Sequence, residues 1–379
     1  MEQPVEEKYL SPEHAGPGKP RILVAPLDWG LGHATRCIPL IGELLAQGAD
    51  VWLAGEKAQE QLLQMEFPDL PFLHLPGYRI QYAKTGKGLL WKMIKQGPQL
   101  RRAIRYEHEW LKKNQDKHGF NAVISDNRYG LYHKTIPCIF ITHQLTIKSP
   151  AGKWTERILQ KRNYHYINRF SECWVPDMPG ENNLAGELSH PLKQPAIPLF
   201  YLGPLSRFNN EVISPSVLNN HLLVLLSGPE PQRSILENVI INEISHYNGT
   251  ATIVRGLPGS LSLIPSTGML RFYNHLPAER LAKEIEEAEF VIGRCGYSTV
   301  MDLVKLKKKN ILIPTPGQTE QEWLARYLLQ KQIAFTVTQK DFSLMDALHK
   351  ARHFMYHHPV MDSGQQLQQV ISRFLSLLS

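Results

Sequence analysis

The sequence predicts an α/β protein with two domains, each built on a doubly wound parallel sheet. Its 379 residues exceed the usual size of a single hydrophobic core. Short apolar runs alternate with helical segments, and this alternation starts at residues 21–27 (RILVAPL) and again at 221–227 (HLLVLLS). In each half the first apolar run leads into a glycine-containing loop and a helix, which indicates two domains of similar architecture.

The first half is expected to form a domain over residues 21–205, preceded by a flexible tail at 1–20. Residues 21–27 predict a strand, DWGLGH a tight glycine loop, and 34–47 a helix closed by Gly48. Further strands are expected at 50–54, 71–75, 121–125, 137–142 and 172–175.

The second half is expected to form a domain over residues 217–362. The proline-rich stretch 194–216 predicts the crossover between the domains, with the linker itself at 206–216. Strands and helices then alternate, and an amphipathic helix is expected at 363–379. The expected strands lie at 221–227, 249–256, 290–293 and 309–314, and the expected helices at 233–246, 278–288 and 318–330.

Composition favours a folded cytoplasmic enzyme. The chain is 42% hydrophobic and 20% charged, as in ordinary globular proteins. Its four cysteines are far apart and form no CxxC pair, so neither a zinc ribbon nor a disulfide framework is indicated. No run of 18 apolar residues and no apolar leader is present, which argues against secretion or membrane spanning.

The net charge of +7 indicates an anionic partner. Residues 84–113 carry nine Lys or Arg against two Glu, interleaved with apolar side chains such as Trp91. This segment predicts either contact with an anionic membrane surface or an ordinary pair of amphipathic helices with a solvated basic face. Nucleic acid is not expected as a partner, because no binding motif for it accompanies the charge.

The segment GRCGYSTVMDL, residues 293–303, predicts an anion site. A strand ends at Gly293, just before the donor-binding candidate Arg294. Gly296 permits a sharp turn, and Ser298 or Thr299 begins a helix whose free N–H groups suit a phosphate. Asp302 lies on the same face of that helix, where its carboxylate could hold ribose hydroxyls. Helix capping without any ligand would use the same residues.

The next unit, ILIPTPGQTEQEWLARYL, adds a second polar loop at the same expected edge. Its strand ends at Pro314, and Gln318, Thr319, Gln321 and Glu322 gather at the start of the following helix. Because ligands of parallel sheets bind beyond the carboxyl ends of the strands, both units are expected to face the cleft between the domains.

Together these two units resemble the C-terminal domain of the bacterial family 28 glycosyltransferases related to MurG, which makes lipid II. Gly296, Thr299 and Asp302 match the first part of the family pattern, and Pro314 and Gln321 match the second. The resemblance implies a GT-B fold, in which two Rossmann-like domains face each other across a cleft. It also implies an inverting, metal-independent transferase that uses a nucleotide-sugar donor.

By the same resemblance, Asp302 would bind the ribose, and Gln321 with Glu322 the hydroxyls of the donor sugar. Asp302 stands where the family more often has Glu, and Gly317 stands where His is common. The loop LLSGPEPQRS resembles the Gly/Ser loop near the diphosphate, with Ser227 and Gly228 as donor contacts and Arg233 as a source of charge. Its two prolines remove backbone donors, so it cannot form a complete phosphate cradle.

His33 is the first candidate for the catalytic base. It follows Gly30 and Gly32 at the first strand-to-helix turn, where the family carries a glycine-rich loop with His. An inverting transfer needs a base that takes the proton of the acceptor hydroxyl, and imidazole suits this role near neutral pH. Helix capping, or a hydrogen bond to donor phosphate with Gly32 beside it, remains an alternative role for His33.

Other polar residues end predicted strands of the first domain. Asp126 and His143 are candidate catalytic or base-orienting residues, and Asp28 is a candidate on the acceptor side. The runs SDNRYG and THQ resemble motifs of bacterial relatives, which adds three acceptor-side candidates: Asn127, Arg128 and Gln144. Capping roles are equally open for each of them.

The predicted function is transfer of a hexose or N-acetylhexosamine, from a UDP-linked or similar donor, to a carbohydrate or lipid-linked acceptor. No cofactor and no metal are expected, since the sixteen histidines are scattered and no DxD motif occurs between strands. A nucleotide-sugar epimerase and a non-catalytic nucleotide-sugar-binding protein are the alternatives. A dinucleotide oxidoreductase is disfavoured, because the third glycine of the fingerprint is absent.

Overall fold

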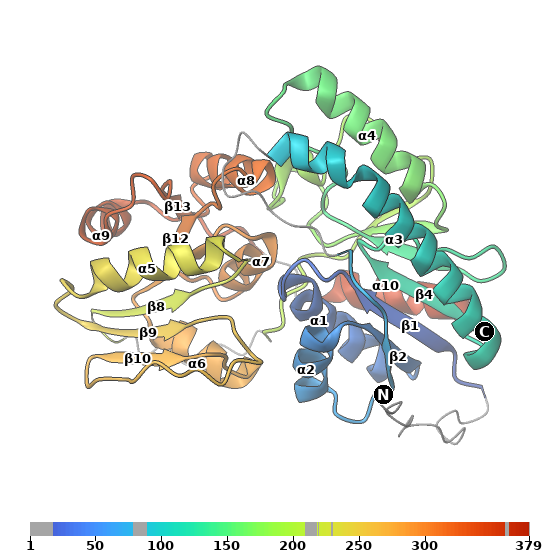
Figure 1. Ribbon diagram of the computed structural model, residues 1–379, viewed down its shortest axis with the longest axis horizontal. Coiled ribbons are helices and arrows are strands. Elements are labelled where there is room, and N and C mark those ends of the chain that lie inside the picture. Colours follow the sequence, from blue (N-terminus) through green and yellow to red (C-terminus); the bar gives the residue numbers. More distant parts are fainter. Residues whose placement is uncertain are drawn as a thin grey trace.

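The computed structural model describes residues 18–78, 89–208, 218, 220–228, 230–360 and 364–378, with the backbone alone for residues 89–96. It has two lobes, each with a central sheet between layers of helices (Figure 1). Most of the expected tail, most of the linker and residues 84–88 of the basic segment lie outside the described residues.

The N-terminal lobe contains a seven-stranded sheet in the order β3-β2-β1-β4-β5-β6-β7, with every pairing parallel. Its strands are β1 Arg21–Pro26, β2 Asp50–Gly55, β3 Phe72–His74, β4 Ala122–Asp126, β5 Cys138–Ile141, β6 Glu172–Val175 and β7 Leu199–Tyr201. Its helices are α1 Gly32–Ala46, α2 Lys57–Glu66, α3 Leu89–His118 and α4 Lys153–Ile167, with a short 3₁₀ turn at Gly186–Leu188.

The C-terminal lobe contains a six-stranded parallel sheet in the order β10-β9-β8-β11-β12-β13. Its strands are β8 His221–Leu225, β9 Thr250–Val254, β10 Leu270–Tyr273, β11 Phe290–Arg294, β12 Asn310–Ile313 and β13 Phe335–Thr336. Its helices are α5 Gln232–Ile244, α6 Ala278–Glu287, α7 Tyr297–Lys305, α8 Thr319–Gln330 and α9 Leu344–His353.

The two sheets share one topology, and this positions the candidate site. In each sheet the second and third strands are added on one side of the first strand, and the chain then crosses back to add the later strands on its other side. The switch points therefore lie between β1 and β4 in the first sheet and between β8 and β11 in the second. Ligands of open parallel sheets bind beyond the strand ends at such points. The confirmed fold thus places both predicted glycine loops at a switch point.

The C-terminal helix α10, Gln365–Ser376, packs on the N-terminal lobe and not on the lobe that precedes it in the chain. Phe374 meets the buried Trp174 edge to face, with ring centroids 5.2 Å apart. Arg373 forms an ion pair with Glu172, and a backbone carbonyl of α10 accepts a hydrogen bond from Gln47. The helix therefore ties the two ends of the chain to one lobe.

Two local expectations need correction. The stretch 194–216 is not entirely a crossover, because β7 lies within it and adds a strand to the first sheet. The described part of the basic segment lies within one 30-residue helix, α3, and does not form a pair of helices. Among the described residues, no helix is long and apolar enough to cross a membrane.

Candidate active site

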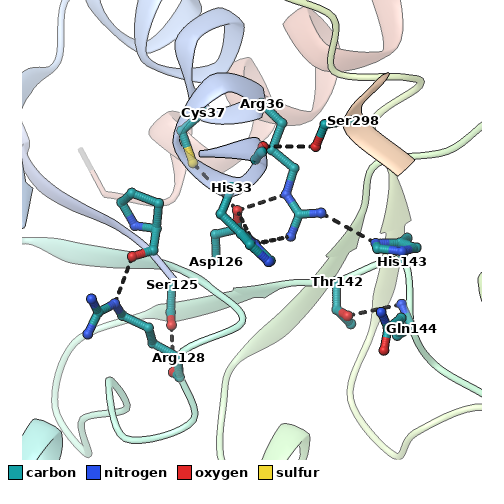
Figure 2. Close-up of polar contacts among 12 residues, drawn as sticks. His33, Arg36, Cys37, Ser125, Asp126, Arg128, Thr142, His143, Gln144 and Ser298 are labelled. Carbon is teal, nitrogen blue, oxygen red and sulfur yellow. Dashed lines mark hydrogen bonds and ion pairs between the residues drawn. The ribbon is translucent and has the colours of Figure 1, made fainter. Parts of the chain in front are cut away.

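His33 lies in the first turn of α1, at the carboxyl edge of the N-terminal sheet. β1 ends at Pro26, and the following loop turns at Gly30, whose φ of 84° glycine adopts without strain. α1 then begins at Gly32, and the His33 side chain projects toward the end of β4 (Figure 2).

Asp126 is the last residue of β4 and pairs in register with Pro26 of β1. Its side chain is fully buried, and both carboxylate oxygens lie 3.2 Å from Nδ1 of His33. The parallel register therefore joins two residues that are far apart in the sequence. They form a His–Asp pair. When Nδ1 carries the proton and donates to Asp126, Nε2 of His33 is the nitrogen left to accept a proton.

Arg36 completes this cluster, although the sequence analysis did not select it. Its Nε donates to Oδ2 of Asp126 at 2.8 Å, and its Nη2 contacts Oδ1. Nη2 also lies 2.9 Å from Nδ1 of His33, and Nη1 lies 3.3 Å from Nδ1 of His143. Figure 2 shows the guanidinium between the His33–Asp126 pair and His143. The three-residue spacing from His33 on one helix was the available signal.

The charges of the cluster determine its protonation. Burial opposes ionisation of Asp126, but Arg36 and His33 outweigh it, so the pKa of this carboxyl lies well below its ordinary value. Burial and Arg36 lower the pKa of His33, against the opposing effect of Asp126. The imidazole is therefore neutral near pH 7, which is the state that a general base needs.

His143 connects the cluster to the C-terminal lobe. It follows β5, its Nε2 lies 2.7 Å from Oε1 of Glu320, and the amide of Gln144 donates to the other oxygen of that carboxylate. The His143 ring also stacks on Tyr297, with centroids 4.2 Å apart and planes 14° from parallel. Glu320 is the second residue of α8. The sequence pattern pointed to the residues on either side of it, and adjacent helix positions face different directions, so Glu320 was not predicted.

The first turn of α7 meets the His33 turn directly. α7 follows Gly296, and the hydroxyl of Ser298 donates to the backbone oxygen of Gly32 at 2.8 Å. A Cβ on Gly32 would lie 3.0 Å from Oγ of Ser298, so this close approach favours glycine. Ser298 and Thr299 thus belong to a helix N-terminus that adjoins His33 from the opposite lobe.

Arg294, at the end of β11, is a buried cation with a sparse environment. Only 1% of it is exposed, and it donates to the backbone oxygens of Gln232 at 2.7 Å and Pro314 at 3.4 Å. Among the described residues, its Nε has no hydrogen-bond partner and no carboxylate forms an ion pair with it. Burial lowers its pKa to about 10. Its position therefore suits an anionic ligand at the switch point.

Asp302 has its carboxylate turned toward the start of the expected linker. It is 7% exposed, accepts a hydrogen bond from Ser206 at 2.8 Å, and lies 3.3 Å from Nε of Arg207. Burial raises its pKa, against the opposing effects of Arg207 and Ser206. A ribose bound at this carboxylate would have to displace Ser206 and Arg207 from it.

The predicted sugar-binding residues of α8 form hydrogen bonds with the loop that precedes the helix. Gln318 is the N-cap residue of α8. The side-chain oxygen of Gln321 accepts from the N–H of Thr315 at 2.9 Å, and Oε1 of Glu322 accepts from the N–H of Gly317 at 2.8 Å. These bonds shape the loop between β12 and α8, whereas Thr319 and Glu320 reach the other lobe. The Thr319 hydroxyl donates to the backbone oxygen of Lys148 at 3.0 Å, and Glu320 contacts His143.

The loop after β8 keeps two of its candidates at the surface. Ser227 and Gly228 are exposed, and Gly228 adopts a φ of 97°. Arg233 instead pairs with Glu230 at 2.6 Å and with Glu237 at 3.0 Å inside the lobe. The expectation that Arg233 supplies charge to a ligand is therefore corrected, because neighbouring carboxylates already neutralise it.

The acceptor-side candidates do not gather in one place. Arg128 is fully buried, donates to a backbone oxygen of β1 and forms a 3.0 Å ion pair with Glu107. Figure 2 shows it directed away from the His33–Asp126 pair, so its acceptor role is corrected to a structural one. Asp28 accepts from the N–H of Tyr78, and Asn127 adopts a φ of 58° beside β5.

Within the described ranges, no group of three or more His, Cys, Asp or Glu side chains is arranged to hold a metal ion. The polar groups that meet at the inter-lobe boundary include the His–Asp pair, the first turn of α7 and the carboxylate of Glu320 in the first turn of α8.

Comparison with known proteins agrees with this architecture. Residues 277–370 match the glycosyltransferase family 28 C-terminal domain, which covers β11, α7, β12 and α8. No curated protein sequence is significantly similar to the chain.

Several solved glycosyltransferases share the fold. SnogD from Streptomyces nogalater is 14% identical, over 95% of this chain and 100% of that chain, with a TM-score of 0.57. SsfS6 from Streptomyces sp. SF2575, complexed with thymidine diphosphate, is 15% identical over 93% and 99%, with a TM-score of 0.57. Phytolacca americana UGT2, complexed with UDP-2-fluoroglucose and pterostilbene, is 15% identical over 94% of both chains, with a TM-score of 0.55.

Two facing parallel-sheet lobes, closed by a helix that returns to the first, define a GT-B protein. Together with the match of residues 277–370 to the family 28 C-terminal domain, this fold makes the chain a glycosyltransferase.

Proposed function

We propose that this protein is an inverting, metal-independent glycosyltransferase that moves a sugar from a nucleotide-diphosphate donor to an acceptor hydroxyl. One observation carries the proposal. A His–Asp pair with a fully buried carboxylate in one lobe adjoins a helix N-terminus in the other, and the Ser298–Gly32 hydrogen bond joins the two turns. A base and an anion site are therefore neighbours across the inter-lobe boundary, as a group transfer from a phosphate ester requires.

The base would be His33. With Nδ1 protonated and directed at Asp126, Nε2 takes the proton of the acceptor hydroxyl as its oxygen attacks the anomeric carbon. Asp126 then stabilises the imidazolium that forms, in the way that a carboxylate orients a catalytic histidine. Attack from the face opposite the leaving group inverts the configuration at that carbon.

The leaving group would be the nucleoside diphosphate. As the bond between the anomeric carbon and the phosphate oxygen breaks, its electron pair stays on that oxygen. The N-terminus of α7, with Ser298 and Thr299, and the buried cation Arg294 supply the compensating positive potential. Because these groups already offset the charge, the proposed reaction needs no metal and no cofactor.

The donor is proposed to be a nucleotide-diphosphate hexose or N-acetylhexosamine, with UDP as the first choice. Two solved neighbours of the same fold carry UDP-2-fluoroglucose and thymidine diphosphate, respectively. The resemblance to MurG-like bacterial enzymes supports UDP and a carbohydrate or lipid-linked acceptor. Asp302 would bind the ribose, and Gln321 and Glu322, with Gln318 nearby, would bind the sugar.

A thermal-shift panel of UDP-, GDP- and dTDP-sugars tests the donor class, because a ligand of the native state raises the Tm by mass action. We expect one nucleotide to raise it, and an Arg294→Met variant to lose that shift. If none of them raises the Tm, the donor site is wrong. Release of free epimerised sugar without acceptor would instead indicate the epimerase alternative.

We also propose that residues 84–113 contact an anionic membrane surface from the cytoplasmic side. In the described part of this segment, Arg101, Arg102 and Arg105 are exposed on α3, together with Lys112 and Lys113. Such a face attracts anionic headgroups at roughly 1 kcal/mol per cation near the surface. Cosedimentation with vesicles that contain 30% anionic lipid tests it, and equal binding to purely zwitterionic vesicles would contradict it.

A further inference from the structure

Arg36 is a buried cation that contacts other residues besides the carboxylate with which it forms an ion pair. Its side chain is 2% exposed, and it contacts Asp126, His33 and His143 at once. A buried charge is costly unless it is paired and hydrogen-bonded, and the bidentate contact with Asp126 satisfies that need. The additional approach to His33 is not required for burial, so it calls for a separate explanation.

Nδ1 of His33 lies between two competing partners. It is 2.9 Å from Nη2 of Arg36 and 3.2 Å from each oxygen of Asp126. A neutral imidazole nitrogen either carries a proton and donates, or lacks one and accepts. If Nδ1 donates to Asp126, Nε2 is free to act as a base. If Nδ1 accepts from Arg36, Nε2 carries the proton and can only donate, for example to a phosphate.

The charged and titratable groups around His33 come from four elements. They are Arg36 and Cys37 on α1, Asp126 on β4, His143 after β5 and Glu320 on α8. Arg36 and Asp126 neutralise each other through their two-point contact. A proton on His33 therefore adds a charge that the Arg36–Asp126 pair does not balance.

We propose that Arg36 is the positioning residue that keeps His33 unprotonated in the resting site, by sharing the Asp126 carboxylate and so weakening, without abolishing, its stabilisation of the imidazolium. This inference rests on the proposed role of His33 as base. Arg36 thereby sets the lowest pH at which the base is ready, and it does so without touching substrate. Loss of its charge would leave Asp126 as an unshared partner for a protonated His33.

The test compares the pH profiles of kcat/KM for the wild type, Arg36→Met and Arg36→Lys. Removing the charge raises the pKa of His33, so we expect the acid limb of Arg36→Met to move up by about one pH unit or more. At the wild-type midpoint this corresponds to a loss of about fivefold in the neutral fraction. Arg36→Lys keeps the charge, and its limb should stay closer to the wild-type limb.

A second readout is independent of activity. The pKa of His33 follows from NMR titration of ¹⁵N-histidine-labelled protein, with His33→Gln used to assign the signal. We expect the Arg36→Met signal to titrate at higher pH. If that variant does not fold, Arg36→Gln replaces it, because the amide keeps a donor to Asp126 and removes the charge.

Arg255→Met is the matched control, since Arg255 forms an ion pair with Glu237 in the other lobe. It should lower stability without moving the acid limb. An unchanged His33 pKa in the charge-removing Arg36 variant overturns the inference, whatever the activity does. Full transfer activity in His33→Ala would instead contradict the proposed role of His33 as base. The NMR titration would then still test whether Arg36 lowers the pKa of His33.

Discussion

The two lobes differ in how the buried charges at the ends of their central strands are compensated. In the N-terminal lobe, the buried charges of Arg36 and Asp126 are matched, and His33 completes a set in which each group has a partner. In the C-terminal lobe, Arg294 is equally buried but meets only backbone oxygens among the described residues. A balanced cluster suits the movement of a proton, whereas an unbalanced cation suits the arrival of an anion.

The topology makes this difference informative. Both sheets have the same strand order around their switch points, so the backbone offers each lobe an equivalent position for a ligand. The side chains at those positions, and not the fold, distinguish the proposed catalytic edge from the proposed phosphate-binding edge. Substitutions and the pH profile of kcat/KM test this difference.

Replacing His33 by Ala should have the largest effect. We expect transfer to fall by roughly 10²–10⁴-fold, the usual contribution of a positioned general base. The thermal shift caused by the nucleoside diphosphate should persist, because the donor edge is intact. Loss of that shift together with activity would show that His33 binds phosphate, and the contrast between the two edges would then fail.

Replacing Arg294 by Met should weaken binding of the nucleoside diphosphate by about 10- to 100-fold, since hydrogen bonds to charged groups contribute roughly 1.5–3 kcal/mol. Isothermal titration measures the Kd. The Tm without ligand should not fall, because the variant removes a buried cation that no carboxylate among the described residues balances. Arg233→Met is the control, and its Tm should fall because Glu237 loses a partner. A lower Tm for Arg294→Met with unchanged affinity would assign Arg294 to structure.

The pH dependence should report the catalytic edge. Burial and Arg36 lower the pKa of His33 from 6.5, so the base stays neutral below pH 6.5 and loses its function only as the pH falls further. The acid limb of kcat/KM should therefore have its midpoint below pH 6.5, with about a tenfold loss per unit beneath it. A midpoint above 6.5 would mean that Asp126 dominates the protonation of His33.

Glu320→Gln should have the smallest effect. It weakens the bridge from α8 to His143 and Gln144, a contact at a carboxylate that is 31% exposed. We expect a few-fold rise in KM for the donor, with kcat little changed, because the loss amounts to about 1 kcal/mol or less. Glu187→Gln, which loosens an exposed ion pair within the N-terminal lobe, is the control and should leave KM unchanged. Equal KM values for the wild type, Glu320→Gln and Glu187→Gln would show that the bridge from α8 to His143 and Gln144 does not contribute to donor binding.

The sequence determined the alternation of strands and helices, and with it the parallel sheets and their glycine loops. His33, Asp126 and Ser298 were selectable because each lies where an apolar run ends, and the carboxyl ends of parallel strands share an edge. That inference needs only local periodicity and the handedness of parallel connections.

Only the tertiary structure decided which side chains meet at that edge. Arg36 lies three residues after His33, and Glu320 directly precedes Gln321, yet the directions of both side chains depend on how α1 and α8 pack against the other elements. Arg128 follows Asp126 closely but turns into the lobe interior to pair with Glu107. A change of one helix or turn position rotates a side chain by a large angle, so long-range packing fixes contacts that local pattern cannot.

The same reason explains the two ends of the chain. The amphipathic pattern of α10 predicted a helix with one buried face, but that pattern does not say which surface covers it. The structure places Phe374 on Trp174, and the last helix therefore completes the first lobe. Local sequence determined the elements and the edges where chemistry is expected, and packing between distant segments brought Arg36 and Asp126 together and left Arg294 among backbone oxygens.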